Sequence, residues 1–117
     1  NMLPKDGNAV LQAVQNGACN LYHTCSHNLL HERSEDLLMQ QYKAAVFILK
    51  AKYFYETGCY VARMDELEQV LGGTDQEILR CAAEIKKGQQ ISLSAMGGIL
   101  LRWLSHLIVQ WIPKQRE

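Results

Sequence analysis

The chain has 117 residues, of which 48% are hydrophobic and 21% are charged, proportions that are ordinary for a folded soluble protein and exclude wholesale disorder. Twelve basic and twelve acidic side chains give a formal net charge of zero, so no strong overall attraction to nucleic acid or to an anionic membrane is expected. The length predicts a single domain, residues 1–117, with one hydrophobic core.

A first long helix is expected over about residues 8–31. Asn8 is a good N-cap, and Gly17 is a weak point that a helix of this length tolerates. Five residues in its second half share one face and should point to the core: Ala18, Leu21, Tyr22, Cys25 and Leu29.

A second long helix is expected from the N-cap Ser34 to Gly58. Glu35 and Asp36 complement the dipole at its start, and Gly58 is well placed to end it in the left-handed conformation. The helix is apolar around most of its circumference, and such a helix must be covered by neighbours. We therefore expect it to be the central helix of the domain.

Two shorter helices should follow. Residues 65–71 predict a short helix that ends at Gly72. Thr74 and Glu77 have the spacing of a capping box, which predicts a further helix over residues 75–87. Gly88 should end that helix.

The last helix is expected to begin near Ser92 or Ser94 and to stop before Pro113. It carries an apolar stripe of Trp103, Leu104, Leu107, Ile108, Trp111 and Ile112, which is either core or a seam for a partner. No window alternates long enough to predict a sheet. Three long helices plus one or two short ones predict an all-α, up-and-down helical bundle.

Lysines on the central helix are the leading candidates for binding. Lys43 and Lys50 are seven residues apart and lie on nearly one line, with Phe47 beside them and Tyr53 nearby. Cations interleaved with aromatic rings can hold a phosphate or stack a base. Alternatively, the lysine stems lie along apolar neighbours while their ammonium groups reach solvent or a carboxylate.

Glu56 lies near the end of the same helix and has two interpretations. It can pair with Lys52, four residues before it, or it can project a carboxylate into a cleft as a base. Lys43, Lys50, Tyr53 and Glu56 are the candidate substrate-binding residues, and the sequence offers no catalytic residue.

A series of possible metal ligands lies on the first helix. Cys19, His23, His27 and His31 recur every four residues, and adjacent members of such a series can chelate one ion. Eight residues of helix span about 12 Å, so one helix supplies only two ligands, and a third must come from elsewhere, for instance His106 or a carboxylate. The alternative is a polar surface face without metal, which we prefer.

Known catalytic motifs are not found in the sequence. It has no nucleophile elbow, phosphate-binding loop or dinucleotide-binding fingerprint. Arg102 and His106 resemble the Arg-x4–6-His signature of HEPN-type ribonucleases, but only three residues separate them, so ribonuclease activity is not expected.

Cysteine usage and hydropathy predict a cytoplasmic location. Four cysteines without a Cys-x-x-Cys pair are best interpreted as free thiols in a reducing compartment. The N-terminus lacks the pattern of a signal peptide. The most apolar segment, residues 99–112, is too short and too polar to span a bilayer, so no membrane association is expected.

The strongest family signal lies in residues 42–60 and 63–67. They read Tyr-Lys-Ala-Ala-Val-Phe-Ile-Leu-Lys-Ala-Lys-Tyr-Phe-Tyr-Glu-Thr-Gly-Cys-Tyr and Arg-Met-Asp-Glu-Leu. This pattern resembles the helical C-terminal domain of bacterial nucleotidyltransferases of the DNA polymerase β superfamily. There, a Tyr-Lys-led aromatic helix ends in Thr-Gly-x-Tyr or a close variant, followed by a basic residue and a short Glu-Leu helix.

The resemblance implies an up-and-down bundle of the nucleotidyltransferase substrate-binding type, related to the C-terminal domain of kanamycin nucleotidyltransferase and to HEPN domains. In such enzymes a separate domain carries Gly-Ser and paired aspartates that hold magnesium and the nucleotide. This sequence has neither a Gly-Ser dipeptide nor an Asp-x-Asp motif. The chain therefore resembles an accessory C-terminal domain whose catalytic partner is supplied in cis or in trans, with magnesium only in that partner.

These expectations lead to three functional hypotheses. The first is a non-catalytic domain that binds the acceptor substrate of a nucleotidyltransferase, a nucleotide or a small molecule, and supports homodimerisation. The second is a protein-interaction module, the HEPN-like half of a toxin–antitoxin pair, with the Trp103 to Trp111 stripe as its partner surface. The third is a small metal-binding helical protein that uses His23 and His27.

Overall fold

The computed structural model describes the backbone of residues 7–116 and the side chains of residues 7–111. Every regular element in this described part is helical: α1 (Gly7–His27), a π-helical turn η1 (Asn28–Glu32), α2 (Glu35–Thr57), α3 (Met64–Val70), α4 (Gly73–Lys86) and α5 (Leu93–Arg116). The all-α prediction is confirmed, and so is the division into long and short helices.

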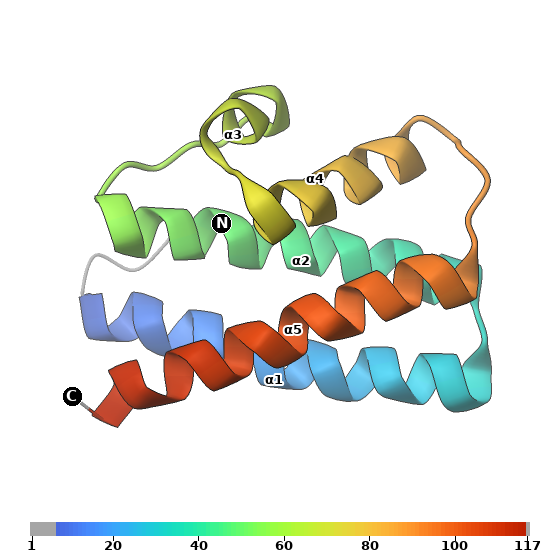
Figure 1. The fold of residues 1–117 in the computed structure, drawn as a ribbon, viewed down its shortest axis with the longest axis horizontal. Coiled ribbons are helices and arrows are strands. Elements are labelled where there is room, and N and C mark those ends of the chain that lie inside the picture. The colour runs from blue at the N-terminus through green and yellow to red at the C-terminus, as the bar shows by residue number, and fades with distance from the viewer. Residues whose placement is uncertain (1–6, 117) are drawn as a thin grey trace.

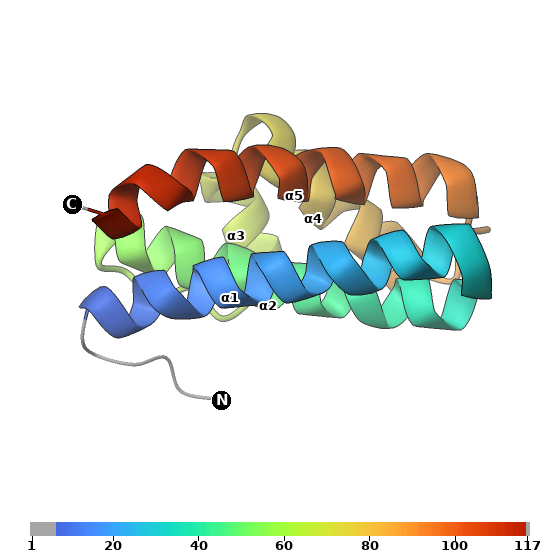
Figure 2. The same ribbon diagram turned by 90° about the horizontal axis from the view of Figure 1, so that it is seen from below.

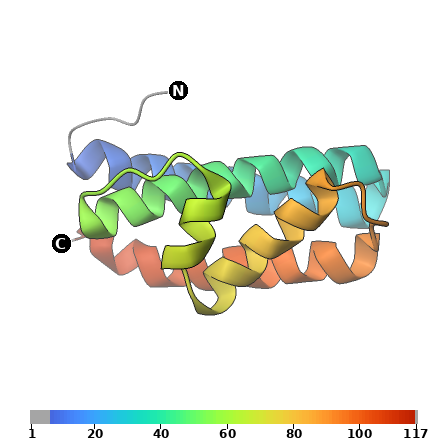
Figure 3. The same cartoon turned by 90° about the horizontal axis from the view of Figure 1, so that it is seen from above.

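The helices form an up-and-down bundle. α1 and α2 are antiparallel neighbours, α4 runs back over α2, and α5 returns along α1 (Figure 1). Seen from below, α1 and α5 lie side by side on one face (Figure 2), whereas α3 and α4 cover α2 on the opposite face (Figure 3). The short helix α3 lies in the connection between α2 and α4.

The tight connection between α1 and α2 is organised by Asn28, whose side chain is fully buried. Its Nδ2 donates to the carbonyl oxygen of Ser34 at 3.0 Å, and the Ser34 N–H donates to Asn28 Oδ1 at 2.9 Å. Between them, Arg33 takes a left-handed conformation with φ of 51°. The amide side chain thus closes the turn as a backbone group would.

Both predicted ends of α2 are confirmed. The Ser34 Oγ accepts a hydrogen bond from the Leu37 N–H at 3.1 Å, as an N-cap should. At the other end Gly58 has φ of 77°, and its N–H donates to the carbonyl oxygen of Phe54 at 2.8 Å. Local sequence therefore sets the length of α2.

Two predicted helix boundaries are wrong. Thr74 is not an N-cap, because Gly73 takes a positive φ of 60° and turns the chain into α4 earlier, with Gly72 as the cap. α5 does not stop before Pro113 but continues to Arg116. Pro113 has no N–H to donate to the carbonyl of Val109, but Val109 is 69% exposed, so water can replace the missing donor.

The core lies between α1, α2, α4 and α5, and α3 adds Leu67 to it. Its largest fully buried side chains are Trp111, Tyr42, Leu38, Leu49, Leu67, Ile78, Leu79, Leu100 and Leu104. Burying each such side chain stabilises the fold by about 1.5–3 kcal/mol. Four of the five residues predicted on the inner face of α1 and η1 pack into or against this core, but Tyr22 is 40% exposed, because it lies at the edge of that face.

The apolar stripe of α5 belongs to this core. Trp103, Leu104, Leu107 and Trp111 are all buried, and Ile108 packs partly against them. The side chain of Ile112 lies outside the described residues. The stripe as a partner surface is therefore a wrong prediction, because the helices of the same chain already cover it.

Cys25 and Cys81 are buried free thiols, and Cys19 and Cys59 are exposed ones. In the part of the chain that the structure describes, no helix combines the length and the apolar character needed to cross a membrane.

Candidate functional site

The three lysines of α2 lie in different environments. Lys43 is exposed, Lys50 is partly exposed, and Lys52 is buried with 9% of its surface accessible. A buried ammonium group needs a counter-ion, whereas an exposed one does not. Lys52 therefore needs a counter-ion within the structure, whereas Lys43 and Lys50 do not.

Lys52 is held in an internal polar cluster that joins three helices. Its Nζ donates to Asp75 Oδ2 of α4 at 2.8 Å and to Glu56 Oε1 at 3.4 Å. The other carboxylate oxygen of Asp75 accepts a hydrogen bond from Trp103 Nε1 of α5 at 2.8 Å. Lys52, Glu56, Asp75 and Trp103 form what we name the clamp.

Electrostatics keep Lys52 charged in the clamp. Burial lowers the pKa of Lys52, but the hydrogen bond to Asp75 and the charges of Asp75 and Glu56 outweigh it, so the net shift is upward. The predicted pairing of Lys52 with Glu56 is confirmed. The Glu56 carboxylate, 40% exposed, is thus partly engaged in structure.

A groove opens on the other side of α2, where this helix meets α3 and α4. It encloses about 480 Å³, within the range of about 300–1,000 Å³ that small-molecule sites occupy. Its lining residues are Met39, Tyr42, Lys43 and Val46 of α2, Met64 of α3, and Ala82, Ile85 and Lys86 of α4. Only two of these eight side chains are charged, and both are lysines.

Tyr42 contributes its ring to the groove but not its hydroxyl. The Tyr42 Oη donates to the carbonyl oxygen of Met96 at 2.6 Å in the core. Burial and the neighbouring Cys81 thiol raise the pKa of Tyr42, so the hydroxyl stays protonated. The groove floor is therefore apolar, and its polar chemistry comes from Lys43 and Lys86.

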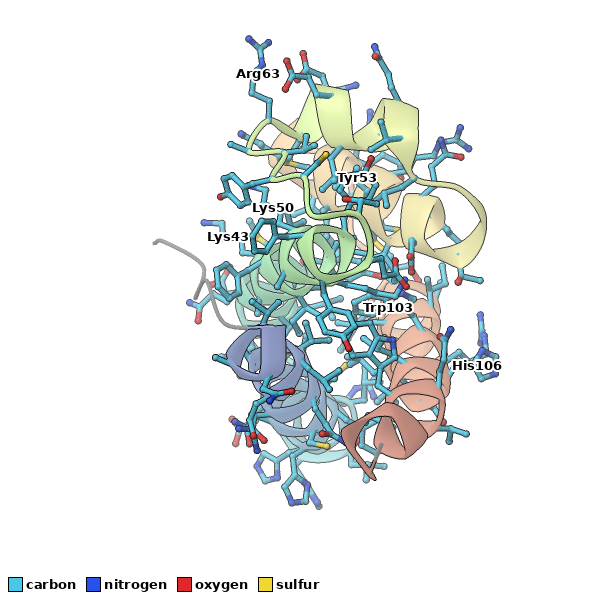
Figure 4. All side chains as sticks on the ribbon, turned by 90° about the vertical axis from the view of Figure 1, so that its left-hand side faces the viewer. Lys43, Lys50, Tyr53, Arg63, Trp103 and His106 are labelled. Atoms are coloured by element: carbon cyan, nitrogen blue, oxygen red, sulfur yellow. The ribbon has the colours of Figure 1, made fainter. Side chains whose placement is uncertain are left out.

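The four predicted substrate-binding residues do not converge on one point. Figure 4 shows Lys43 and Lys50 on the same side of α2, but the groove lining contains Lys43 alone of the four. Helix geometry rotates Tyr53 about 60° and Glu56 about 120° around the axis from Lys50. Lys43 and Glu56 are also separated by about 20 Å of helix rise. Their common binding role remains a prediction.

The histidine face of α1 forms a second hollow of about 540 Å³, lined in part by His23, His27, Glu32 and Gln41. His27 Nε2 lies 3.4 Å from Glu32 Oε2, and the His27 and His31 rings are 4.9 Å apart. Among the described residues, no three His, Cys, Asp or Glu side chains are placed to hold a metal ion together. His106, the suggested third ligand, projects away from the bundle on α5 (Figure 4).

Sequence reasoning missed most of the groove. Met39, Tyr42, Lys43 and Val46 follow the spacing of one helix face, a signal that was available. In the sequence, Lys86 is only a basic residue near the end of the helix expected over residues 75–87, where it suits the helix dipole. Its position opposite Lys43 depends on how α4 packs across α2, which no local pattern encodes.

Comparisons with protein-family models, with curated proteins and with solved structures found no match to this chain.

Proposed function

We propose that this chain is the non-catalytic, substrate-binding helical domain of a nucleotidyltransferase, and that its α2–α4 groove holds the acceptor substrate. The cavity beside Lys43 carries the proposal, because Lys43 is the first basic residue of the Tyr-Lys motif on which the family resemblance depends. A concave apolar site with a few convergent polar groups is the usual form of a small-molecule site.

Five carboxylates of the described residues are paired with other side chains of this chain. Asp75 is engaged by Lys52 and Trp103, while Asp65 pairs with Arg63. Glu32, Glu56 and Glu68 each lie within 3.4 Å of a basic side chain. Nucleotidyl transfer with magnesium needs carboxylates clustered around the ion. The catalytic domain that supplies them, in cis or in trans, is part of the proposal.

Lys50 extends the binding surface beyond the groove. It lies two helical turns from Lys43 on the same side of α2, about 10 Å along the axis, with Phe47 between them 49% exposed. An acceptor longer than the groove, or the nucleotide itself, can contact Lys50 and stack on Phe47. Tyr53 and Glu56 are turned away from Lys50 around α2, so we propose that they contact parts of the substrate that extend past this surface. We expect the holoenzyme to be a homodimer.

The test is nucleotidyl transfer by protein purified with its native partners. The preparation is incubated with magnesium, each of four α-labelled nucleoside triphosphates and the small-molecule fraction of the source cells. We expect label to appear in an acceptor, and Lys43→Met to raise the acceptor KM about tenfold with little change in kcat, because it removes binding and not chemistry.

Lys87→Met is the matched control, because Lys87 is an exposed lysine next to Lys86 that does not line the groove. It should leave both kinetic constants unchanged. Failure to label any acceptor with all four nucleotides would refute the nucleotidyltransferase role. Transfer that is insensitive to Lys43→Met would refute the groove as the acceptor site.

A further inference from the structure

We infer, resting on the proposed function, that the α2–α4 groove selects an amphipathic anion: a ligand with an apolar body and one phosphate or carboxylate end. The juxtaposition of Lys43 and Lys86 at an otherwise apolar groove points to this class. A neighbouring hollow is also bordered by two lysines, Lys86 and Lys87, but unlike the groove it contains two carboxylates as well.

The positive charge of the groove is not neutralised by the protein. None of the ion pairs among the described residues includes Lys43 or Lys86. Lys86 also borders a neighbouring hollow that contains Asp65 and Glu68. Those two carboxylates already face arginines: Asp65 lies 2.8 Å from Arg63 Nη2, and Glu68 lies 3.4 Å from Arg80 Nε. Lys86 therefore remains available to an anion in the groove.

The floor of the groove selects against polar ligand bodies. Apart from the lysines, its side chains are apolar or, in Tyr42, have their hydroxyl committed to the Met96 carbonyl. A donor or acceptor of a ligand that is buried there without a partner loses the hydrogen bonds it made to water, which weakens binding. Met39 and Met64 are flexible thioethers that adapt to apolar groups of different shape. A polyhydroxylated body is therefore disfavoured, and a cationic one is repelled by both lysines.

Three probes that share one apolar body separate charge from hydrophobicity. Octyl phosphate, octanol and octyltrimethylammonium are titrated into the full chain below their micelle concentrations, with binding measured by calorimetry and located by amide chemical shifts. We expect octyl phosphate to bind at the groove at least about tenfold more tightly than the other two, with an affinity that falls with salt. Inorganic phosphate alone should bind much more weakly, because it lacks the apolar body.

Variants assign the effect to the two lysines. Lys43→Met and Lys86→Met should each weaken octyl phosphate binding about three- to tenfold, and Lys43→Arg should retain most of it. Lys87→Met removes the same charge next to the groove and should change the affinity less than about twofold. Circular dichroism checks that each variant is folded.

Equal affinity for the three probes would overturn the inference. So would chemical-shift changes located away from α2 and α4, or a loss of octyl phosphate affinity in Lys87→Met as large as that in Lys43→Met and Lys86→Met. Tight binding of inorganic phosphate would refute the requirement for an apolar body. These outcomes are separate from the proposed function. If octyl phosphate does not bind but nucleotidyl transfer still depends on Lys43, only the ligand class is refuted. If octyl phosphate binds but no nucleotidyl transfer is observed, only the nucleotidyltransferase role is refuted.

Discussion

Substitution of Asp75 by Asn tests whether the clamp holds α2, α4 and α5 together. Asn keeps the shape of the side chain and an oxygen that accepts from Trp103 Nε1, but it removes the negative charge that lies 2.8 Å from Lys52 Nζ. Lys52 is then left with Glu56 alone, at 3.4 Å. The variant therefore measures how much the free energy of unfolding falls when the buried ammonium group of Lys52 loses its nearest counter-ion.

The burial of the Lys52–Asp75 ion pair sets the expected loss in the free energy of unfolding. Removing one partner of a fully buried ion pair costs about 3–5 kcal/mol, whereas an exposed pair contributes about 0–1 kcal/mol. The Lys52 and Asp75 side chains are 11% and 18% exposed, close to the buried limit. We expect Asp75→Asn to lower the free energy of unfolding by about 2–4 kcal/mol, which corresponds to about 8–15 °C in Tm for a chain of this size.

Urea unfolding at pH 7, followed by circular dichroism, measures the effect. Asp65→Asn is the matched control, because Asp65 forms an exposed ion pair with Arg63: the Arg63 side chain is 71% exposed and the Asp65 side chain 63%. The urea midpoint of this variant should stay near that of the wild type. Adding Lys52→Met to Asp75→Asn should recover much of the loss, since it removes the uncompensated charge. Equal midpoints for the two Asn variants, or no recovery in the double variant, would refute the reasoning.

Three further predictions concern a buried thiol and two glycines of α5. Burial raises the pKa of the Cys25 thiol from 9.0 to about 11, so the unfolded chain loses this proton at lower pH than the folded protein. The free energy of unfolding should fall as pH rises from about 9 to about 11, and fall less steeply in Cys25→Ala; parallel slopes in urea titrations would contradict this. Gly98→Ala should raise stability by up to about 1 kcal/mol, because its methyl group would meet only Arg102 Nη1, at 3.6 Å. Gly97→Ala should be less stable than Gly98→Ala by about 1–2 kcal/mol, because its methyl group would overlap the Leu29 side chain, which must shift; equal Tm values for the two variants would argue against this packing.

Features that depend on a few adjacent residues were predictable. Ser34 and Gly58 bound α2 because a hydroxyl next to a free N–H, and a residue without a Cβ, act within one turn of helix. Glu56 was expected beside Lys52 because the two are four residues apart. Thr74 is not the N-cap because Gly73, immediately before it, takes a positive φ and already begins the helix.

Features that depend on packing between distant segments were not predictable. In the sequence, Asp75 is only the residue after the expected cap Thr74, yet it compensates Lys52, 23 residues away in sequence, and binds Trp103, 28 residues away. The α5 stripe was open to two interpretations because an apolar face does not specify what covers it. Its burial against the helices of this chain removed one of them.

The sequence by itself determined the all-helical class and the ends of α2, because helix periodicity and caps act over distances of a few residues. The tertiary structure alone decided which lysine of α2 is structural and which faces a groove. Their neighbours along the chain are similar, so the distinction comes from the segments packed against them. At Lys52 that segment is the start of α4 with Asp75, and at Lys43 it is the end of α4 with Lys86.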